Sequence, residues 1–264
     1  MKTFVWHETD SFLHRLNPLT KLALNVPVVA IVSLTYEPIT PLAIGFLALL
    51  AARVLGQLPW PALLRPLGVA VLLSVGMFWT STVFYTGPGA EDSAPAVWLG
   101  PIRLTFAGLV YGAAMAARLL AIFATSLLFV LTTDPTEFVL ALIQQGRLPY
   151  RVGYGVFAAY RFVPLFEEEF ANVRAAHQMR GGVGADGLIA RLRQVAGYVI
   201  PLLAIAVRKG ERVALAMDAR AFGALPHRTY FRRTALGWND AIFAVGAGGT
   251  LLTLVLVRLA LGSG

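Results

Sequence analysis

The sequence contains no cysteine and few charged residues. Of its 264 residues, 14% are charged and 57% are hydrophobic, and the formal net charge is +8. The absence of cysteine excludes disulfides, thiolate metal sites and cysteine nucleophiles. A soluble domain usually carries about 25% charged residues, and the mean hydropathy here is +0.69. The composition therefore indicates that much of the chain is surrounded by lipid and not by water.

Motifs for nucleotide binding and catalysis are missing as well. The sequence has no Gly-x-x-x-x-Gly-Lys-Ser/Thr loop, no Gly-x-Ser-x-Gly elbow and no His-Glu-x-x-His helix. Its four histidines, at positions 7, 14, 177 and 227, do not have the spacing of metal ligands. We therefore expect no enzyme activity, no cofactor and no metal site.

Five apolar segments are candidates for membrane spans, each of which needs about 20 helical residues. They are Leu22–Tyr36, lengthened if Leu16–Lys21 forms its first turns, Pro38–Val54, Pro66–Tyr85, Leu104–Leu131 and Ala241–Leu261. Gly87–Pro101 is predicted to be an external loop because it is rich in Gly and Pro and holds Glu91 and Asp92. Met1–Lys21 contains acidic residues and no continuous apolar core, so we expect no cleavable signal peptide.

Residues 132–239 have a different pattern. Their apolar runs, Val152–Phe166 and Val195–Val207, are short and flanked by charges, which is more typical of interfacial or core helices than of spans. Whether these runs enter the bilayer is left open by the sequence. We predict an all-α integral membrane protein of about five transmembrane helices. It would have four spans in 1–131, cytoplasmic or interfacial coupling helices in 132–239 and a final span in 240–264.

The basic residues predict the orientation. Lys2, Arg15 and Lys21 precede the first span, Arg53 and Arg65 follow the second, and fourteen Lys and Arg lie between Arg147 and Arg233. Cytoplasmic loops carry an excess of such residues. We therefore expect the N-terminus and the coupling region in the cytoplasm, and the positive charge does not indicate nucleic acid.

The fourth span contains small residues and one arginine. Gly108 and Gly112 form a Gly-x-x-x-Gly pair, which allows helix backbones to approach closely in lipid. The pair is interpreted as packing within this chain or, alternatively, as a face for a membrane partner. Arg118 is unfavourable in hydrocarbon unless it faces protein or reaches the interface.

Two helices of the coupling region are expected to end in an arginine among small residues. The first is predicted to end at Met179-Arg180-Gly181 and the second at Ala219-Arg220-Ala221, shortly before Gly223 and Pro226. Each arginine either caps its own helix or docks in an acidic groove of another protein, and its recurrence favours docking.

These residues resemble the transmembrane (T) component of energy-coupling factor transporters, the EcfT and CbiQ group. That family has two Ala-Arg-Gly motifs, and the two arginine segments match them with Met179 replacing alanine and Ala221 replacing glycine. Three further segments are similar to family patterns: Leu13–Leu22, Arg161-Phe-Val-Pro-Leu165, and Thr132–Glu137 followed by Leu148-Pro149.

The resemblance implies a role in uptake across a bacterial or archaeal cell membrane. Arg180 and Arg220 would contact two cytoplasmic ATPase subunits, supported by Arg161, Pro164 and Asp218. The chain would pass ATP-driven motion to a small substrate-binding S component for a vitamin or a transition metal ion. The alternatives are the permease subunit of another ABC-type transporter, a self-contained secondary transporter and a membrane-bound enzyme.

Overall fold

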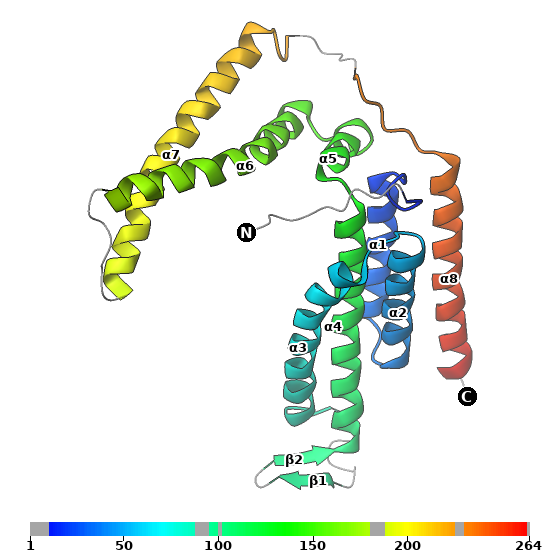
Figure 1. The fold of residues 1–264 in the computed structure, drawn as a ribbon. Coiled ribbons are helices and arrows are strands. Elements are labelled where there is room, and N and C mark those ends of the chain that lie inside the picture. Colours follow the sequence, from blue (N-terminus) through cyan, green and yellow to red (C-terminus); the bar gives the residue numbers. More distant parts are fainter. Residues whose placement is uncertain (1–10, 88–94, 100–101, 180–187, 225–229, 263–264) are drawn as a thin grey trace. The chain divides into compact units, whose positions relative to one another are not determined.

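The computed structural model describes residues 11–87, 95–99, 102–179, 188–224 and 230–262. The chain divides into two compact units, the first formed by Met1–Ala141 with Thr234–Gly264 and the second by Leu142–Arg233. The elements (Figure 1) are α1 (Pro18–Ser33), α2 (Ile39–Val54), α3 (Trp60–Val83), β1 (Pro95–Leu99), β2 (Ile102–Thr105), α4 (Phe106–Thr132), α5 (Pro135–Gln144), α6 (Tyr150–Met179), α7 (Leu188–Ala219) and α8 (Trp238–Gly262).

The helices α1, α2, α3, α4 and α8 coincide with the five apolar segments. Helices α3 and α4 are long and apolar enough to cross a membrane, and α1 and α2 are shorter apolar helices. Two details differ from the expectation. Helix α3 begins at Trp60 and not at Pro66, because Pro61 is tolerated in the first turn of a helix. The predicted loop at 87–101 contains β1, which pairs antiparallel with β2. The fold is that of an all-α membrane protein with one small hairpin.

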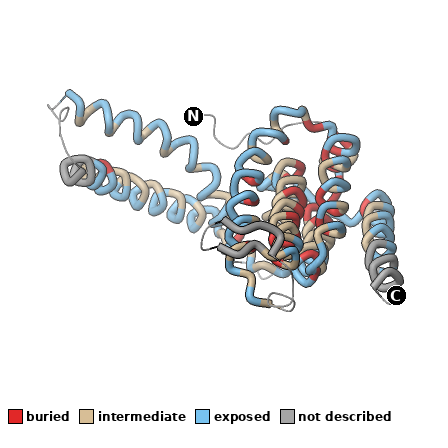
Figure 2. The backbone as a smooth tube through the Cα atoms, turned by 90° about the horizontal axis from the view of Figure 1, so that it is seen from below, coloured by how far each residue is buried: buried red, intermediate tan, exposed pale blue. Residues whose placement is uncertain are grey.

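Helix α4 is the centre of the first unit, where it contacts α1, α2 and α3. Ala114, Ala117, Ala121 and Ala124 are buried along it. A Cβ added at Gly45 of α2 would lie 3.2 Å from Cα of Ala121, so small residues set this close approach. Figure 2 shows buried residues gathered inside the bundle and exposed residues on its outer faces. Large apolar side chains on those faces, such as Leu72 at 73% exposure, suit a lipid environment.

Gly108 and Gly112 face α3. A Cβ at Gly108 would lie 2.9 Å from the Thr82 carbonyl oxygen. A Cβ at Gly112 would lie 2.8 Å from the Phe78 carbonyl oxygen and would overlap Oγ1 of Thr82. The pair is thus used for packing between α3 and α4 inside this chain.

Arg118 binds the end of α1. Its Nη2 donates a hydrogen bond of 2.6 Å to the Thr35 carbonyl oxygen, and its guanidinium carbon lies 5.4 Å from the centre of the Tyr36 ring. Thr35 follows Leu34, the cap of α1, so its carbonyl oxygen has no partner within the helix. The arginine in the fourth span is therefore held by the protein itself.

Asp240 joins the starts of α1 and α8. Its Oδ1 accepts a hydrogen bond of 2.7 Å from the Asn17 N–H, and its Oδ2 accepts one of 2.7 Å from the Gly237 N–H. Lys21 is also buried here, with Nζ donating to the Thr132 carbonyl oxygen at 2.7 Å. Both carboxylate oxygens thus satisfy N–H groups that helix starts leave unpaired.

Replacing Asp240 with alanine is expected to lower the stability of the first unit by about 2–5 kcal/mol, because two backbone N–H groups lose their acceptor. Thermal unfolding of the purified chain in detergent, followed by tryptophan fluorescence, measures this. Asn239→Ala, at an exposed neighbour in the same turn, is the control. Equal midpoints for the two variants would contradict the assignment.

Candidate functional site: the Arg220 helix end

Helices α6 and α7 of the second unit pack against each other in opposite directions (Figure 1). Near the end of α6, His177 and Phe170 contact the buried Tyr198 ring of α7 at centroid distances of 5.1 and 6.0 Å. Further along α7, Lys209 forms an ion pair of 3.0 Å with Glu169. These contacts fix the part of α7 that precedes the second arginine segment.

Helix α7 ends in a Schellman motif. The Phe222 N–H donates to the Met217 carbonyl oxygen at 3.0 Å, and the Ala221 N–H donates to the Asp218 carbonyl oxygen at 2.9 Å. Ala221 has φ +55°, the left-handed conformation that this motif requires of the residue after the cap. Arg220 is therefore the C-cap residue, the position at which the chain leaves the helix.

The chain after this cap is attached to the first turns of α6. The Phe222 ring lies 5.7 Å from the Tyr150 ring and 5.4 Å from the Tyr154 ring, both edge-on. Gly223 has φ +93°, and a Cβ there would lie 3.1 Å from Nη2 of Arg151. Each such aromatic pair contributes about 0.5–1.5 kcal/mol beyond its buried area. Aromatic contacts thus fix the position of the Arg220 cap.

The Arg220 side chain is exposed and makes no hydrogen bond or ion pair with any described residue. The neighbouring backbone groups are occupied by the Schellman motif, so Arg220 presents an unpaired cation on a rigid support. All five N–H donors of its guanidinium are therefore available to hydrogen-bond a carboxylate of a partner protein.

The other predicted site residues are spread along α6 and α7. Met179 is the last residue of α6 and is 84% exposed, whereas Arg180 and Gly181 lie outside the described residues. Arg161 and Pro164 are exposed in the middle of α6, and Asp218 takes part through its carbonyl oxygen in the cap. Across the described part of the chain, no three His, Asp or Glu residues form a group that would hold a metal ion.

The profile of the CbiQ family, described as cobalt transport protein, matches residues 9–231. The chain belongs to the CbiQ and EcfT family. An EcfT protein of Heliobacterium modesticaldum and one of Acidaminococcus fermentans, each called an energy-coupling factor transporter transmembrane protein, are both 30% identical to it. Both alignments cover 96% of this chain and 95% of the relative.

A longer protein also contains a region similar to this chain. It is a putative ABC transporter ATP-binding protein of Bifidobacterium longum, 28% identical over 89% of this chain and 30% of its own length. Membership of the CbiQ and EcfT family establishes the chain as the transmembrane component of an energy-coupling factor transporter.

The sequence did not predict the aromatic contacts that hold the Arg220 cap against α6. Phe222 follows the motif directly, and Tyr150 and Tyr154 open α6, but nothing in a single sequence pairs residues about 70 positions apart. The available signal was an apolar residue just after a helix end, which often packs back on the last turn in a Schellman motif.

Replacing Ala221 with glycine, the residue of the family motif, is expected to stabilise the helix end by about 0.5–1 kcal/mol, because glycine adopts positive φ without strain. Ala221→Val, the opposite change, should destabilise it, because a β-branched residue is disfavoured at positive φ. Amide hydrogen exchange of residues 220–224 measures both. Unchanged exchange in both variants would contradict the assignment.

Proposed function

We propose that this chain transmits conformational change from two ATPase subunits to a small substrate-binding S component. The observation that carries the proposal is the Arg220 cap, an exposed and unpaired guanidinium on an anchored helix end. Arg180, which follows Met179, is proposed as the equivalent contact at the end of α6. Both arginines would meet acidic grooves on the ATPases.

The arrangement of α6 and α7 supports two separate ATPase contacts. Because the helices are antiparallel, Met179 lies at one end of α6 and the Arg220 cap lies beside Tyr150 at the other. A 30-residue helix such as α6 is about 45 Å long. One groove on one subunit is too small for both ends, so each arginine is assigned to its own ATPase.

The similarity to the Bifidobacterium longum protein supports the ATPase partner. Its printed name is that of an ATP-binding protein, and the region similar to this chain covers 30% of its length. In the Bifidobacterium longum protein, the ATPase and the coupling region would thus belong to one polypeptide. In the present protein, the ATPase would be a separate subunit that binds the coupling region. We propose that this region faces the cytoplasm, which the excess of fourteen Lys and Arg between Arg147 and Arg233 supports, and that the first unit crosses the membrane several times.

The apolar faces of α6 and α7 support a membrane partner. Val152, Val156 and Tyr160 are 43–53% exposed on α6, and Ile200 and Leu203 are 71% and 59% exposed on α7. Such faces need lipid or an apolar partner. We assign them to the S component and the membrane surface. The S component would select the cargo, which we propose to be a vitamin or a transition metal ion.

Replacing Arg220 with glutamate is expected to weaken ATPase binding by about 2–5 kcal/mol, because it places an acid against an acidic groove. This is a loss of at least about thirtyfold in affinity. The measurement is co-purification of ATPase subunits with the tagged chain from native membranes in mild detergent.

The control is Arg208→Glu, which makes the same change of charge at an exposed residue of α7 three turns earlier. Retention of the ATPases by the Arg220 variant would contradict the proposal. So would purification of the unaltered chain alone, which would favour a self-contained transporter.

A further inference from the structure

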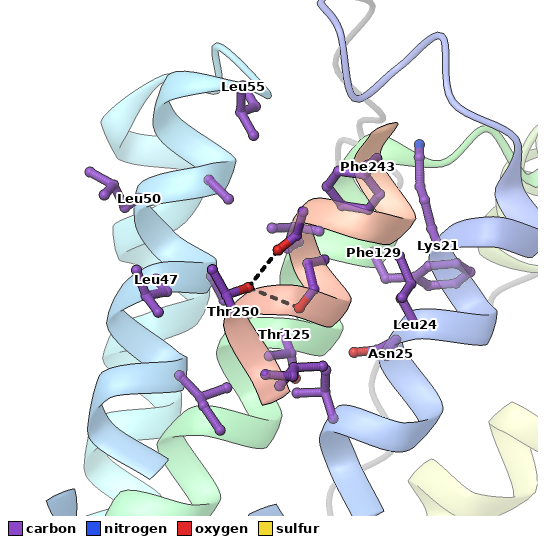
Figure 3. A pocket seen from close by; sticks show the side chains of 18 of the residues that line it. Lys21, Leu24, Asn25, Leu47, Leu50, Leu55, Thr125, Phe129, Phe243 and Thr250 are labelled. Atoms are coloured by element: carbon purple, nitrogen blue, oxygen red, sulfur yellow. Dashed lines mark hydrogen bonds between the residues drawn. The ribbon is translucent and has the colours of Figure 1, made fainter. Parts of the chain in front are cut away.

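The first unit contains an apolar cavity that family membership does not explain. It has a volume of about 720 Å³ and lies among α1, α2, α4 and α8 (Figure 3). Leu24, Val28, Leu47, Leu128, Phe129 and Phe243 make much of its wall. Val28 and Leu251 also pack on the buried cluster of Val32, Ile44 and Ala121, which closes one end.

The hydroxyls of the wall are already satisfied. Oγ1 of Thr125 donates to the Ala121 carbonyl oxygen at 3.0 Å, and Oγ1 of Thr250 donates to the Ala247 carbonyl oxygen at 2.8 Å. Asn25 differs. Its amide points into the cavity in Figure 3 and has no hydrogen bond to any described residue. Asn25 is partly buried, and its amide is available to an occupant that has a polar atom at this depth.

The cavity has a polar end one helical turn from Asn25. Lys21 lies at this end. It precedes Asn25 by four residues in α1, which is about 6 Å along the helix axis. Its Nζ donates to the Thr132 carbonyl oxygen, and the carboxylates of Glu137 and Asp240 lie close enough to act on it electrostatically. An occupant therefore meets Lys21 at one end of the cavity, then the Asn25 amide, then an apolar wall.

The volume of the cavity favours a flexible chain over a helix as its occupant. A helix about 10–12 Å across rises 5.4 Å per turn, so each turn fills roughly 420–600 Å³. The cavity of about 720 Å³ holds fewer than two turns of the five or six that span a bilayer. A hydrocarbon chain is narrower than a helix, so it can enter a cavity that is too small for several helical turns.

We propose that this cavity binds one phospholipid. An acyl chain fills the apolar part, an ester oxygen accepts a hydrogen bond from the Asn25 amide, and the headgroup lies at the end marked by Lys21. Because Glu137 and Asp240 balance the charge of Lys21, the site does not require an anionic headgroup. The bound lipid fills the space between α8 and α2.

The test uses two glycines of α8. Gly246 lines the cavity and Gly249 does not. A Cβ added at either glycine meets no described residue within 4 Å, so we expect both positions to accept a larger side chain. Gly246→Leu puts its side chain into the cavity, and Gly249→Leu adds the same atoms outside it. Asn25→Leu removes the polar contact and keeps the volume.

Native mass spectrometry of the full chain, purified in a maltoside detergent, measures the phospholipid retained. We expect about one per unaltered chain and per Gly249→Leu chain. We expect at least about tenfold less in Gly246→Leu and a Kd raised about tenfold by Asn25→Leu, the equivalent of about 1.4 kcal/mol.

Equal retention by the two glycine variants would overturn the proposal, as would an unaltered chain that retains no lipid. Loss of a co-purified membrane protein from Gly246→Leu, with lipid unchanged, would overturn it in favour of helix docking. Retention that depends on an anionic headgroup would contradict the placement beside Lys21.

Discussion

Replacing Gly112 with leucine is expected to prevent the first unit from folding. The new side chain would meet the Phe78 carbonyl oxygen and Oγ1 of Thr82, which itself donates to Phe78 at 2.8 Å. Overpacking usually destabilises by about 1–3 kcal/mol, and more where backbone must move. Because α3 and α4 pack along much of their length, separating them loses a large part of a total stability of about 5–15 kcal/mol.

The yield of monodisperse protein on size-exclusion chromatography in detergent measures the effect of this substitution. Gly76→Leu is the matched control, since it adds the same side chain to α3 at a position where a Cβ meets nothing within 4 Å. We expect Gly76→Leu to elute like the unaltered chain and Gly112→Leu to aggregate. A monodisperse Gly112 variant with an unchanged unfolding temperature would show that α3 and α4 do not approach here.

Changing both Arg180 and Arg220 to glutamate is expected to abolish ATP-dependent uptake. If each arginine holds one ATPase, each change weakens one contact by about 2–5 kcal/mol, and the two losses add because the sites are far apart. Uptake by whole cells, corrected for the amount of tagged chain in the membrane, measures the result.

A double variant with the same change of charge, Arg208→Glu with Arg212→Glu, tests whether net charge alone explains the effect. Both arginines are exposed on α7, two and three turns before the cap. We expect this control to retain most of the uptake. Equal loss in both double variants would assign the effect to the charge of the region and not to the helix ends.

Local features of the sequence predicted much of this architecture. Hydropathy located α1, α2, α4 and α8 to within a few residues, because a bilayer demands long apolar helices. Helix α3 starts six residues before the predicted Pro66, because Pro61 is tolerated in the first turn of a helix. The glycine and the small residues after Arg220 correctly predicted a helix end, because the signals for such an end are local.

Contacts between distant residues were not predictable. The β1–β2 hairpin depends on pairing within a segment whose composition is that of a loop. The partner of Arg118 is a backbone carbonyl at Thr35, and a carbonyl leaves no trace in the sequence. The contact of Phe222 with Tyr150 and Tyr154 likewise depends on how α6 and α7 cross.

The hydrogen bond between Asn17 and Asp240 has a consequence for biogenesis. These residues are 223 positions apart, so the carboxylate that completes the start of α1 belongs to α8, which is synthesised after α1 to α7. Until that helix is inserted, the Asn17 N–H lacks this acceptor, and the buried ammonium of Lys21 lacks the nearby charge of Asp240. A chain that stops before residue 234 therefore lacks the carboxylate that completes the start of its first helix.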